Sequence, residues 1–451
     1  MVNTENGAKA YELKNKCLEF FSKVGGMRHS SQIEKAQYFI DAASEDLKTA
    51  VKILFWARDA RRGAGERKTF HDIVGKFIDV DFIARNAHAL INIGYAKDLL
   101  PYMSNDKVLS AWSYILKGKD TGVRQELVAK WTPRRGPIFK AIRDRMAITN
   151  KELRMLLVKL SSTVEQSMSK KDWDDIEYSS VPGAAMRKYG KAFVRHDEER
   201  FNNCKLDKDS KASVSATYPH DVIKSAYSSE DWDLSQKLWD NLPQLKGDVN
   251  PIIMADTSGS MTGLPMLVSC SLGLFCSEQL PGKFNGKVLT FSRDPKFHDL
   301  TKFHRLEDKW NYLNGNMDWG YGTDFKKAYS LLLETGKFFN VSNKDMPKMV
   351  ICISDMQFDR AEDGNSLYDS LKNAYKDAGY DFPKLVYWNV RASVGSPVDD
   401  LSNNVALISG FNPAVIKPLL NGDDFNPVKT MYDSINHIDL DFTYNPLKGM
   451  S

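Results

Sequence analysis

The chain is poor in cysteine and has no long apolar run, and each absence narrows what the protein can be. Five cysteines stand among 451 residues, without CxxC or other zinc-like spacing, and mostly in apolar segments. An odd number of such cysteines is typical of reduced, buried thiols in an intracellular protein. No apolar segment approaches the ~20 residues of a membrane-spanning helix. The polar residues 1–6 lack the pattern of a signal peptide, so we expect a cytoplasmic protein with no membrane partner. We also expect it to be a monomer.

Common enzyme motifs are missing as well. The turn at residues 61–67 is no Walker A loop, which needs GxxxxGK[ST], and HExxH does not occur. The pairs His196-Asp197 and His220-Asp221 could suggest acid–base catalysis, but neither lies beside a recognisable nucleophile. Such pairs more often cap helices or hold domains together. We therefore expect that the protein is not an enzyme.

Positive charge is unevenly placed along the chain. Residues 1–250 hold 42 Lys and Arg against 34 Asp and Glu, whereas residues 251–451 hold 20 against 24. Within residues 107–145, ten basic residues stand beside three acidic ones. A basic N-terminal half next to an acidic C-terminal half predicts that a polyanionic partner would bind the N-terminal half.

Residues 1–245 are predicted to form an α-helical domain of HEAT-like repeats. Apolar residues such as Leu13, Cys17, Phe20 and Val24 recur at helical spacing, and this first pattern stops at Gly25-Gly26. Similar segments follow to about residue 165 with little β-branched alternation, so strands are not expected there. Helix pairs of roughly 35–45 residues are typical of an α-solenoid. The alternative is an irregular helical domain, because no tight repeat motif is visible.

Residues 246–451 are predicted to form a second domain of the α/β class. Strand and helix patterns alternate along it, which is typical of a doubly wound, Rossmann-like parallel sheet. The predicted strands are 250–256, 287–291, 348–355, 384–390 and 404–409, and the predicted helices are 265–280, 323–336 and 365–378.

A candidate metal site lies at the ends of two of these strands. Asp256, Ser258 and Ser260 follow one apolar run, Thr323 starts a later helix, and Asp355 ends a second apolar run. Open α/β sheets place ligands at such strand ends. Hard oxygen donors suit Mg²⁺, with Mn²⁺ as the alternative. The other interpretation is a helix N-cap in which Ser260 bonds backbone N–H groups.

Two basic segments are candidates for contact with RNA. The turn with Arg61, Arg62 and Arg67 could bind phosphate, or it could be a helix–helix turn in which Glu66 pairs with an arginine. A second segment interleaves basic residues with Trp131 and Phe139, a combination that suits single-stranded nucleic acid. Its basic residues are Lys130, Arg134, Arg135, Lys140, Arg143 and Arg145. The alternative is a solvated face with Trp131 packed into the repeat core.

The order of the candidate metal ligands resembles the metal-ion-dependent adhesion site of von Willebrand factor A (vWA) domains. Together with motifs in the first half, the chain resembles the Ro autoantigen (TROVE plus vWA) superfamily, and in particular its branch of bacterial, plant and phage-type proteins. The motifs of the first half are Arg58–Arg67, Gly94–Leu99, Trp131–Arg134, Val181–Met186, Arg195–Asp197 and Tyr218–Asp221.

The resemblance implies a ring of HEAT-like repeats closed against a vWA domain. It also implies that single-stranded RNA ends bind in the central hole and structured RNA on the basic outer face. In the metal site it implies direct coordination by Asp256, Ser258 and Ser260, and direct or water-mediated coordination by Thr323 and Asp355. The chain departs from animal Ro proteins over most of its first half, so no particular RNA is implied.

Three functions remain open on the sequence. The first is an RNA-binding protein, a scaffold or chaperone for small structured or misfolded RNA, with a non-catalytic metal site. The second is a protein-interaction module whose bound metal grips an acidic residue of a partner protein, for example an ATPase machine. The third is a metal-dependent nuclease, although no general base stands near the site.

Overall fold

The computed structural model describes residues 2–3, 9–118, 123, 125–161, 163–207, 212–214, 216–317, 324–358, 367–393, 395–421 and 425–449. No helix among these residues is long and apolar enough to cross a membrane. All five cysteines are free thiols, four of them buried, and only Cys204 is half-buried.

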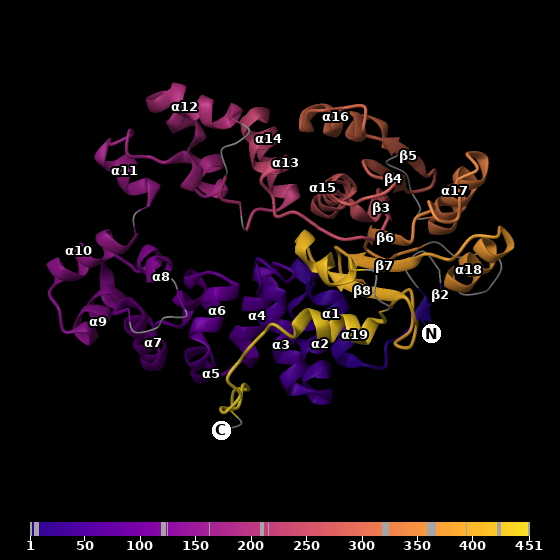
Figure 1. Cartoon of the computed structure of the whole chain (residues 1–451). Helices are drawn as coiled ribbons and strands as arrows, with labels where there is room; N and C mark the ends of the chain where they lie inside the picture. Colours follow the sequence, from indigo (N-terminus) through magenta and orange to yellow (C-terminus); the bar gives the residue numbers. More distant parts are fainter. Residues whose placement is uncertain are drawn as a thin grey trace.

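The first half of the chain is helical, as predicted, and its helices pack mainly against their neighbours in sequence (Figure 1). This sequential packing is what a HEAT-like array requires. The short antiparallel pair β1 (Val2–Asn3) and β2 (Lys9–Ala10) was not predicted. The helices are α1 (Lys16–Val24), η1 (Met27–His29), α2 (Gln32–Glu45), α3 (Leu47–Arg58), α4 (Arg67–Phe77), α5 (Val80–Arg85), α6 (Ala87–Ile93), η2 (Ala96–Tyr102), α7 (Asp106–Leu116), α8 (Gln125–Trp131), α9 (Gly136–Met146), α10 (Asn150–Ser161), α11 (Val164–Lys170), η3 (Tyr178–Ser180), α12 (Gly183–Leu206), α13 (Pro219–Ser229) and α14 (Trp232–Asp240).

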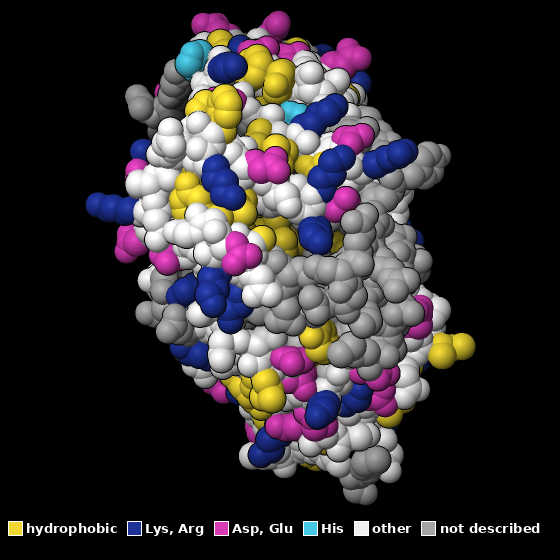
Figure 2. Space-filling model, turned by 90° about the vertical axis from the view of Figure 1, so that its right-hand side faces the viewer, with side chains coloured by type: hydrophobic (Ala, Val, Ile, Leu, Met, Phe, Trp, Pro, Cys, Tyr) yellow, Lys and Arg dark blue, Asp and Glu magenta, His cyan; other side chains and the backbone are white. Residues whose placement is uncertain are grey.

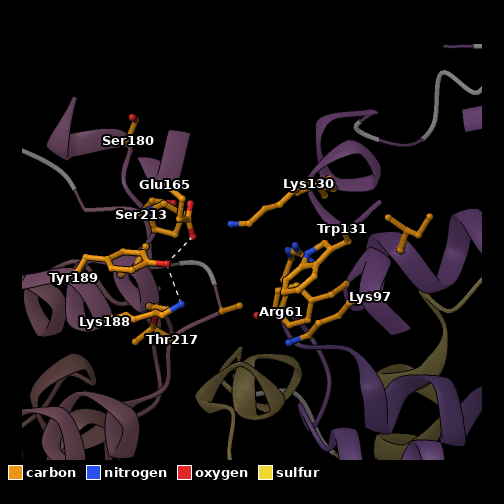
Figure 3. A pocket seen from close by; sticks show the side chains of 18 of the residues that line it. Arg61, Lys97, Lys130, Trp131, Glu165, Ser180, Lys188, Tyr189, Ser213 and Thr217 are labelled. Atoms are coloured by element: carbon orange, nitrogen blue, oxygen red, sulfur yellow. Dashed lines mark hydrogen bonds between the residues drawn. The ribbon is translucent and has the colours of Figure 1, made fainter. Parts of the chain in front are cut away.

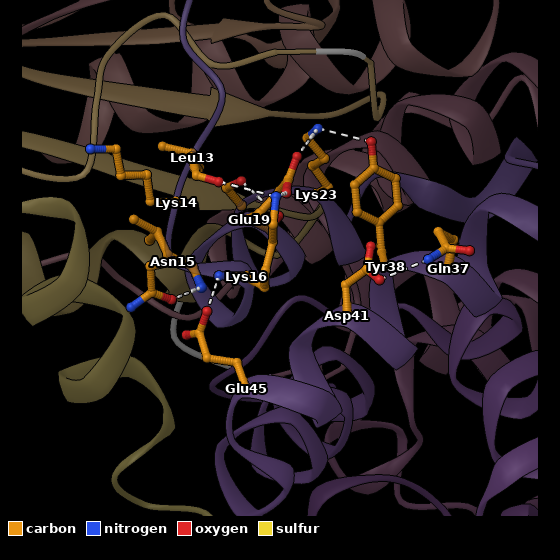
Figure 4. Close-up of polar contacts among 12 residues, drawn as sticks. Leu13, Lys14, Asn15, Lys16, Glu19, Lys23, Gln37, Tyr38, Asp41 and Glu45 are labelled. Carbon is orange, nitrogen blue, oxygen red and sulfur yellow. Dashed lines mark hydrogen bonds and ion pairs between the residues drawn. The ribbon is translucent and has the colours of Figure 1, made fainter.

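Local signals explain where the first helices begin and how they pair. Ser31 and Glu34 form a capping box at the start of α2, which satisfies two otherwise free backbone N–H groups. Polar contacts join α1 to α2 beside their apolar core (Figure 4): the buried Lys23 amine donates to Glu19 and to the Tyr38 hydroxyl. A buried ammonium group needs such partners, because burial without them is costly.

The second half forms a six-stranded sheet in the order β5-β4-β3-β6-β7-β8. The strands are β3 (Pro251–Asp256), β4 (Lys287–Phe291), β5 (Lys296–Asp299), β6 (Met349–Ser354), β7 (Lys384–Asn389) and β8 (Val405–Ser409). All neighbours are parallel except the edge strand β5, which pairs antiparallel to β4. The chain order reverses at β3, which is the switch point of a doubly wound sheet. The predicted Rossmann-like, vWA-like α/β fold is therefore confirmed.

The helices of the second half are α15 (Leu264–Gln279), η4 (Gly259–Met261), α16 (Leu306–Asn316), α17 (Phe325–Phe338), α18 (Leu367–Asp377), η5 (Pro413–Leu419) and α19 (Pro427–Ile435). Helix α15 is apolar around most of its circumference, because it lies buried between the sheet and α13. Strand β5 and helices α16 and α19 were not predicted. The sequence gives no clear strand pattern for β5, because this edge strand is short and polar.

The helical part contacts the sheet domain at both of its ends, so the chain closes into a ring (Figure 1). At one end α1 packs against the edge strand β8 and against α19, and at the other α13 and α14 pack against α15 and α16. Between these ends, one arm runs out through α6–α10 and a second arm returns through α11 and α12.

Close backbone contacts and hydrogen bonds stabilise the junction between α1 and the edge strand β8. The Ser409 hydroxyl donates to the Phe21 carbonyl and accepts from the Gly25 amide. A Cβ atom at Gly25 would lie 2.5 Å from the Gly410 nitrogen, so only glycine fits there. Nearby, the Asn412 side-chain amide donates to the Gly63 carbonyl, and His437 bonds the buried Asp59 carboxylate at 2.9 Å.

Candidate functional site

The candidate metal centre lies at the switch point of the sheet. Asp256 ends β3 and Asp355 follows β6, the strand next to it, so both carboxylates reach the same edge of the sheet. The Asp256 carboxylate accepts from the Ser258 amide at 2.9 Å and from the Ser354 hydroxyl at 2.5 Å. The Ser258 and Ser260 hydroxyl oxygens are 3.1 Å apart. The structure thus brings four of the predicted ligands to the same edge of the sheet, and Thr323 lies outside the described residues.

Two buried carboxylates at this point would repel each other. Asp256 is 0% and Asp355 2% exposed. Burial, and after it the negative charge of Asp355, raises the pKa of Asp256 to about 7. A divalent cation would stabilise both charged carboxylates, and serine hydroxyls complete the hard donor set that such a cation prefers. Among the described residues no group of three or more His, Cys, Asp and Glu side chains could hold a metal ion.

A loop of the sheet domain links this centre to the helical part. The Arg391 guanidinium donates to the Ser260 carbonyl, and the Ser393 hydroxyl donates to the Asp355 carbonyl at 2.5 Å. The amide between these two residues, that of Ala392, donates to the carbonyl of Gly26 at 3.2 Å. The loops that carry the candidate metal ligands and the end of α1 therefore contact one connecting segment.

A second candidate site is a cavity of about 790 Å³ between the two arms of the ring (Figure 3). One wall comes from the α3–α4 turn, α6, η2 and α8, and the other from α11, α12, Ser213, Ala216 and Thr217. The side chains labelled on the first wall are Arg61, Lys97, Lys130 and Trp131, and those on the second are Glu165, Ser180, Lys188, Tyr189, Ser213 and Thr217.

The cavity holds an excess of positive charge. The described lining residues include four cations, Arg61, Lys97, Lys130 and Lys188, and none of these forms an ion pair with another described residue. Glu165 is the single carboxylate among the described lining residues, and it accepts from the Tyr189 hydroxyl at 3.2 Å. Arg61 donates to the Asn92 carbonyl and Lys188 to the Tyr189 hydroxyl, but these neutral acceptors leave the positive charges free to attract an anion that enters the cavity.

Lys97 occupies a slot between two aromatic rings. Its Nζ lies 5.1 Å from the ring centre of Tyr95 and 5.0 Å from that of Trp131. Burial and the nearby charge of Arg67 lower the pKa of Lys97, although Asp98 offsets part of this effect. A phosphate would stabilise the charged form of this lysine, and the two rings offer flat apolar faces beside it.

Asp98 anchors this wall from behind. Its side chain is 0% exposed, and its carboxylate accepts two hydrogen bonds from the Arg58 guanidinium, at 2.6 and 2.9 Å. The Arg67 guanidinium and the Tyr95 amide each donate to it at 2.9 Å. The His71 ring nitrogen lies 3.0 Å from it. Burial alone would raise the pKa of Asp98, but the His71 bond and the Arg58 and Arg67 contacts outweigh it and hold the pKa well below its usual range. The segment that carries Tyr95 and Lys97 is thus held by a buried charge network.

The cavity brings together only some of the predicted RNA-contacting residues. Arg61 and Lys130 line it, and Arg67 lies behind its wall. Lys97, Lys188 and Tyr189 were missed, although Lys97 stands in the quoted motif at residues 94–99. The signal that could have found them is the basic residue beside an aromatic one in Tyr95-Ala96-Lys97 and in Lys188-Tyr189.

The other predicted basic residues lie outside the cavity. Arg62 is exposed near Asp59, at 3.7 Å. Arg143 and Arg145 of α9 pair with Asp144 and Asp106. Arg134, Arg135 and Lys140 are exposed without an ion pair to a described residue, and Arg134 donates to the Ser161 hydroxyl. Figure 2 shows the other side of the molecule, that of the sheet domain, and there basic and acidic side chains are interspersed outside the grey areas.

The turn at residues 59–66 is built chiefly as a junction. Glu66 pairs with Arg28 at 2.9 Å and caps α4, which is the helix–helix alternative. The Arg61 and Arg62 amides donate to the Asp59 carboxylate, and those of Ala60, Ala64, Gly65 and Glu66 donate to backbone carbonyls. What the turn can offer a ligand is therefore its arginine side chains.

The two His-Asp pairs serve packing. His196 stacks on Trp173 with ring centres 4.5 Å apart, and Asp197 accepts from Tyr178 and Arg200 at a kink in α12. His220 is 4% exposed and packs against Tyr218 and Phe411, at the junction of the helical part with the sheet domain.

Comparisons with known proteins match both halves of the chain. The family model described as domain of unknown function (DUF2828) matches residues 115–249, and that described as domain of unknown function (DUF7788) matches residues 250–445. An uncharacterized protein of Acanthamoeba polyphaga mimivirus is 28% identical, in an alignment that covers 98% of this chain and 88% of that protein. The crystal structure of the Deinococcus radiodurans RO (RSR) protein matches with 12% identity and a TM-score of 0.38, over 96% of each chain.

Proposed function

We propose that this protein binds single-stranded RNA in the cavity between the two arms of its ring. The proposal is carried by four cations that line this cavity and have no ion-pair partners among the described residues. The aromatic rings of Tyr95, Trp131 and Tyr189 lie beside them. Single-stranded nucleic acid needs both features, a cationic groove for the backbone and aromatic faces for the bases. The sequence motifs that resemble the Ro superfamily point to the same class of ligand.

A duplex is a poor fit for this cavity. Its volume of about 790 Å³ is that of a small-ligand pocket, whereas a duplex needs a groove or an open surface. Structured RNA would therefore bind elsewhere, and the exposed Arg134, Arg135 and Lys140 on and before α9 form the candidate outer surface.

The test of the proposal is the affinity for a fluorescent uridine oligonucleotide, measured by anisotropy. We expect the Lys97→Glu/Lys130→Glu variant to lose at least about tenfold in affinity, because two phosphate contacts become repulsive. The matched control is Arg135→Glu/Lys140→Glu, which changes the same charge outside the cavity and should retain the affinity for the oligonucleotide. Equal affinities of both variants and the natural protein would refute the proposal.

Contact of structured RNA with the outer surface has its own test. The Arg134→Glu/Arg135→Glu variant should recover less structured RNA in crosslinking and sequencing, while oligonucleotide binding persists. Unchanged recovery would remove these residues from the RNA surface.

We propose further that Asp256, Ser258, Ser260 and Asp355, together with Thr323, hold Mg²⁺ in a binding role and not a catalytic one. The buried pair of carboxylates supports this, since a cation is what relieves their repulsion. The ion would supply a position for a carboxylate of a partner protein, which is how the interaction-module alternative would operate. Mg²⁺ should raise the melting temperature of the natural protein, since a ligand of the folded state stabilises it. Asp256→Asn should abolish that shift, and an unaltered shift would contradict the assignment.

A further inference from the structure

A second cavity adjoins the first and has the opposite charge. It measures about 400 Å³ and lies between α8, α10, α11 and residues 175–185. Leu127, Lys130, Glu165, Ser180, Pro182 and Ala185 line both cavities, so the two spaces share a boundary. Beyond that boundary the lining carries Glu126, Asp175 and Glu177 in addition to Glu165, and Lys130 is the only cation among the lining residues that the structure describes.

Two charged residues mark the boundary. Lys130 extends from α8 toward the opposite wall, where Glu165 lies (Figure 3). Glu165 is fixed there: one of its carboxylate oxygens accepts from the Tyr189 hydroxyl, and the other is buried without a hydrogen bond to a described residue. A strand that moves inward from the basic cavity therefore meets a fixed carboxylate.

Phosphodiester groups would be repelled beyond this point. Among the described lining residues, four cations face one carboxylate in the basic cavity, whereas one cation faces four carboxylates in the second cavity. The repulsion is strongest at Glu165, which is partly buried, because the exposed carboxylates of Glu126, Asp175 and Glu177 are screened by water. Ser179 holds Glu177 in its charged form, since the hydroxyl and the amide of Ser179 both donate to that carboxylate and lower the pKa of Glu177.

We propose that the acidic cavity is a stop for the bound strand. The end of the strand enters the basic cavity and is halted at Lys130 and Glu165, so the protein holds a short terminal stretch and does not let the strand thread through. Glu126, Glu165, Asp175 and Glu177 are then specificity-determining residues that limit how many nucleotides are enclosed. The inference rests on the proposed binding of single-stranded RNA in the basic cavity.

The test uses RNA hairpins that carry a single-stranded tail of increasing length at either end, and maps which tail nucleotides the protein protects from hydroxyl radicals. If the acidic cavity stops the strand, the terminal nucleotides stay protected at every tail length. The nucleotides added to a longer tail then lie outside the cavity, next to the hairpin, and are cleaved. If the terminal nucleotides become cleavable as the tail grows, the strand threads through and the proposal fails.

Variants separate the stop from the binding site. Glu126→Gln/Asp175→Asn/Glu177→Gln should let the strand pass, so that the terminal nucleotides of long tails become cleavable, and an unchanged protection pattern would overturn the role of these carboxylates. The matched control is Asp172→Asn/Glu198→Gln/Glu199→Gln, which removes three exposed charges outside both cavities and should protect as the natural protein does. Melting temperatures of both variants establish that they are folded. The Lys97→Glu/Lys130→Glu variant distinguishes failure of the proposed RNA binding from failure of the proposed stop. If this variant binds tailed RNA normally, the proposal of RNA binding in the basic cavity is wrong, whatever the protection pattern.

Discussion

The Nζ atom of Lys97 lies 5.0 Å from the ring centre of Trp131, at the wall of the cavity between the two arms. This contact joins a cation without an ion pair among the described residues to a flat apolar face. Each can engage a different part of one nucleotide, the phosphate and the base.

Trp131→Ala should weaken the binding of single-stranded RNA. Base–aromatic stacking contributes about 1–3 kcal/mol per base, so we expect a loss of roughly tenfold or more in affinity. Trp173→Ala, which removes a tryptophan of the second arm that lies outside both cavities, is the control and should bind normally. Anisotropy titrations with a uridine oligonucleotide measure both, and equal affinities would mean that no base stacks on Trp131.

Replacing Lys97 and Lys130 by glutamine should flatten the salt dependence of RNA binding. For single strands, log K falls with log salt at a slope of about −0.7 per neutralised phosphate, so losing two contacts should make the slope less negative by about 1.4. The measurement is a series of titrations from low to physiological salt. A parallel loss of affinity at all salt concentrations would show that these lysines do not meet phosphates.

Asp98→Asn should strongly destabilise the fold. It leaves the Arg58 guanidinium, whose side chain is 2% exposed, without its charged partner. Breaking a buried ion pair by removing one partner costs about 3–5 kcal/mol in the free energy of unfolding. Urea titration measures the loss, and the exposed Asp174→Asn serves as the control with no expected change. Replacing both members, with Arg58→Met and Asp98→Leu, should restore part of the stability, and a double variant less stable than Asp98→Asn would contradict this account.

The fold should lose stability between pH 6.5 and pH 4 through His220. Burial, opposed in part by Asp221, lowers the pKa of His220 to about 4 from a usual 6.5. The unfolded chain therefore takes up a proton in this window while the folded chain does not, and the free energy of unfolding falls as the pH falls, by up to about 3 kcal/mol. His220→Gln should remove that part of the pH dependence of urea denaturation. The exposed His196→Gln should leave it in place, and identical curves for His220→Gln and the natural protein would contradict the assignment.

The strand ends that carry the candidate metal ligands could be predicted because their signals are local. Asp256 and Asp355 each follow an apolar run of strand length, and parallel strands bring such ends to one edge of the sheet. Strand β5 gave no such signal, because it is short and polar and pairs only with β4, at the edge of the sheet. The prediction of Thr323 as a ligand falls outside the described residues.

The cavity could be predicted only in part, because the ring brings together residues that are far apart in sequence. Lys130 and Trp131 stood out in a basic and aromatic segment, but nothing local indicates that Lys97 and Lys188 face one space. The ion pairs of Arg143 and Arg145 depend on side-chain placement, which charge counts along the chain cannot supply. The charge reversal between the two cavities likewise follows from how α8 faces α11 and α12.

The most direct test of RNA binding in the cavity is to map crosslinks from an oligonucleotide that carries 4-thiouridine at each position in turn. After irradiation, mass spectrometry identifies the attached residues. The account predicts crosslinks to Tyr95, Lys97, Trp131 and Tyr189, and their loss in the Lys97→Glu/Lys130→Glu variant. Crosslinks confined to residues outside the cavity, and unchanged in that variant, would contradict it.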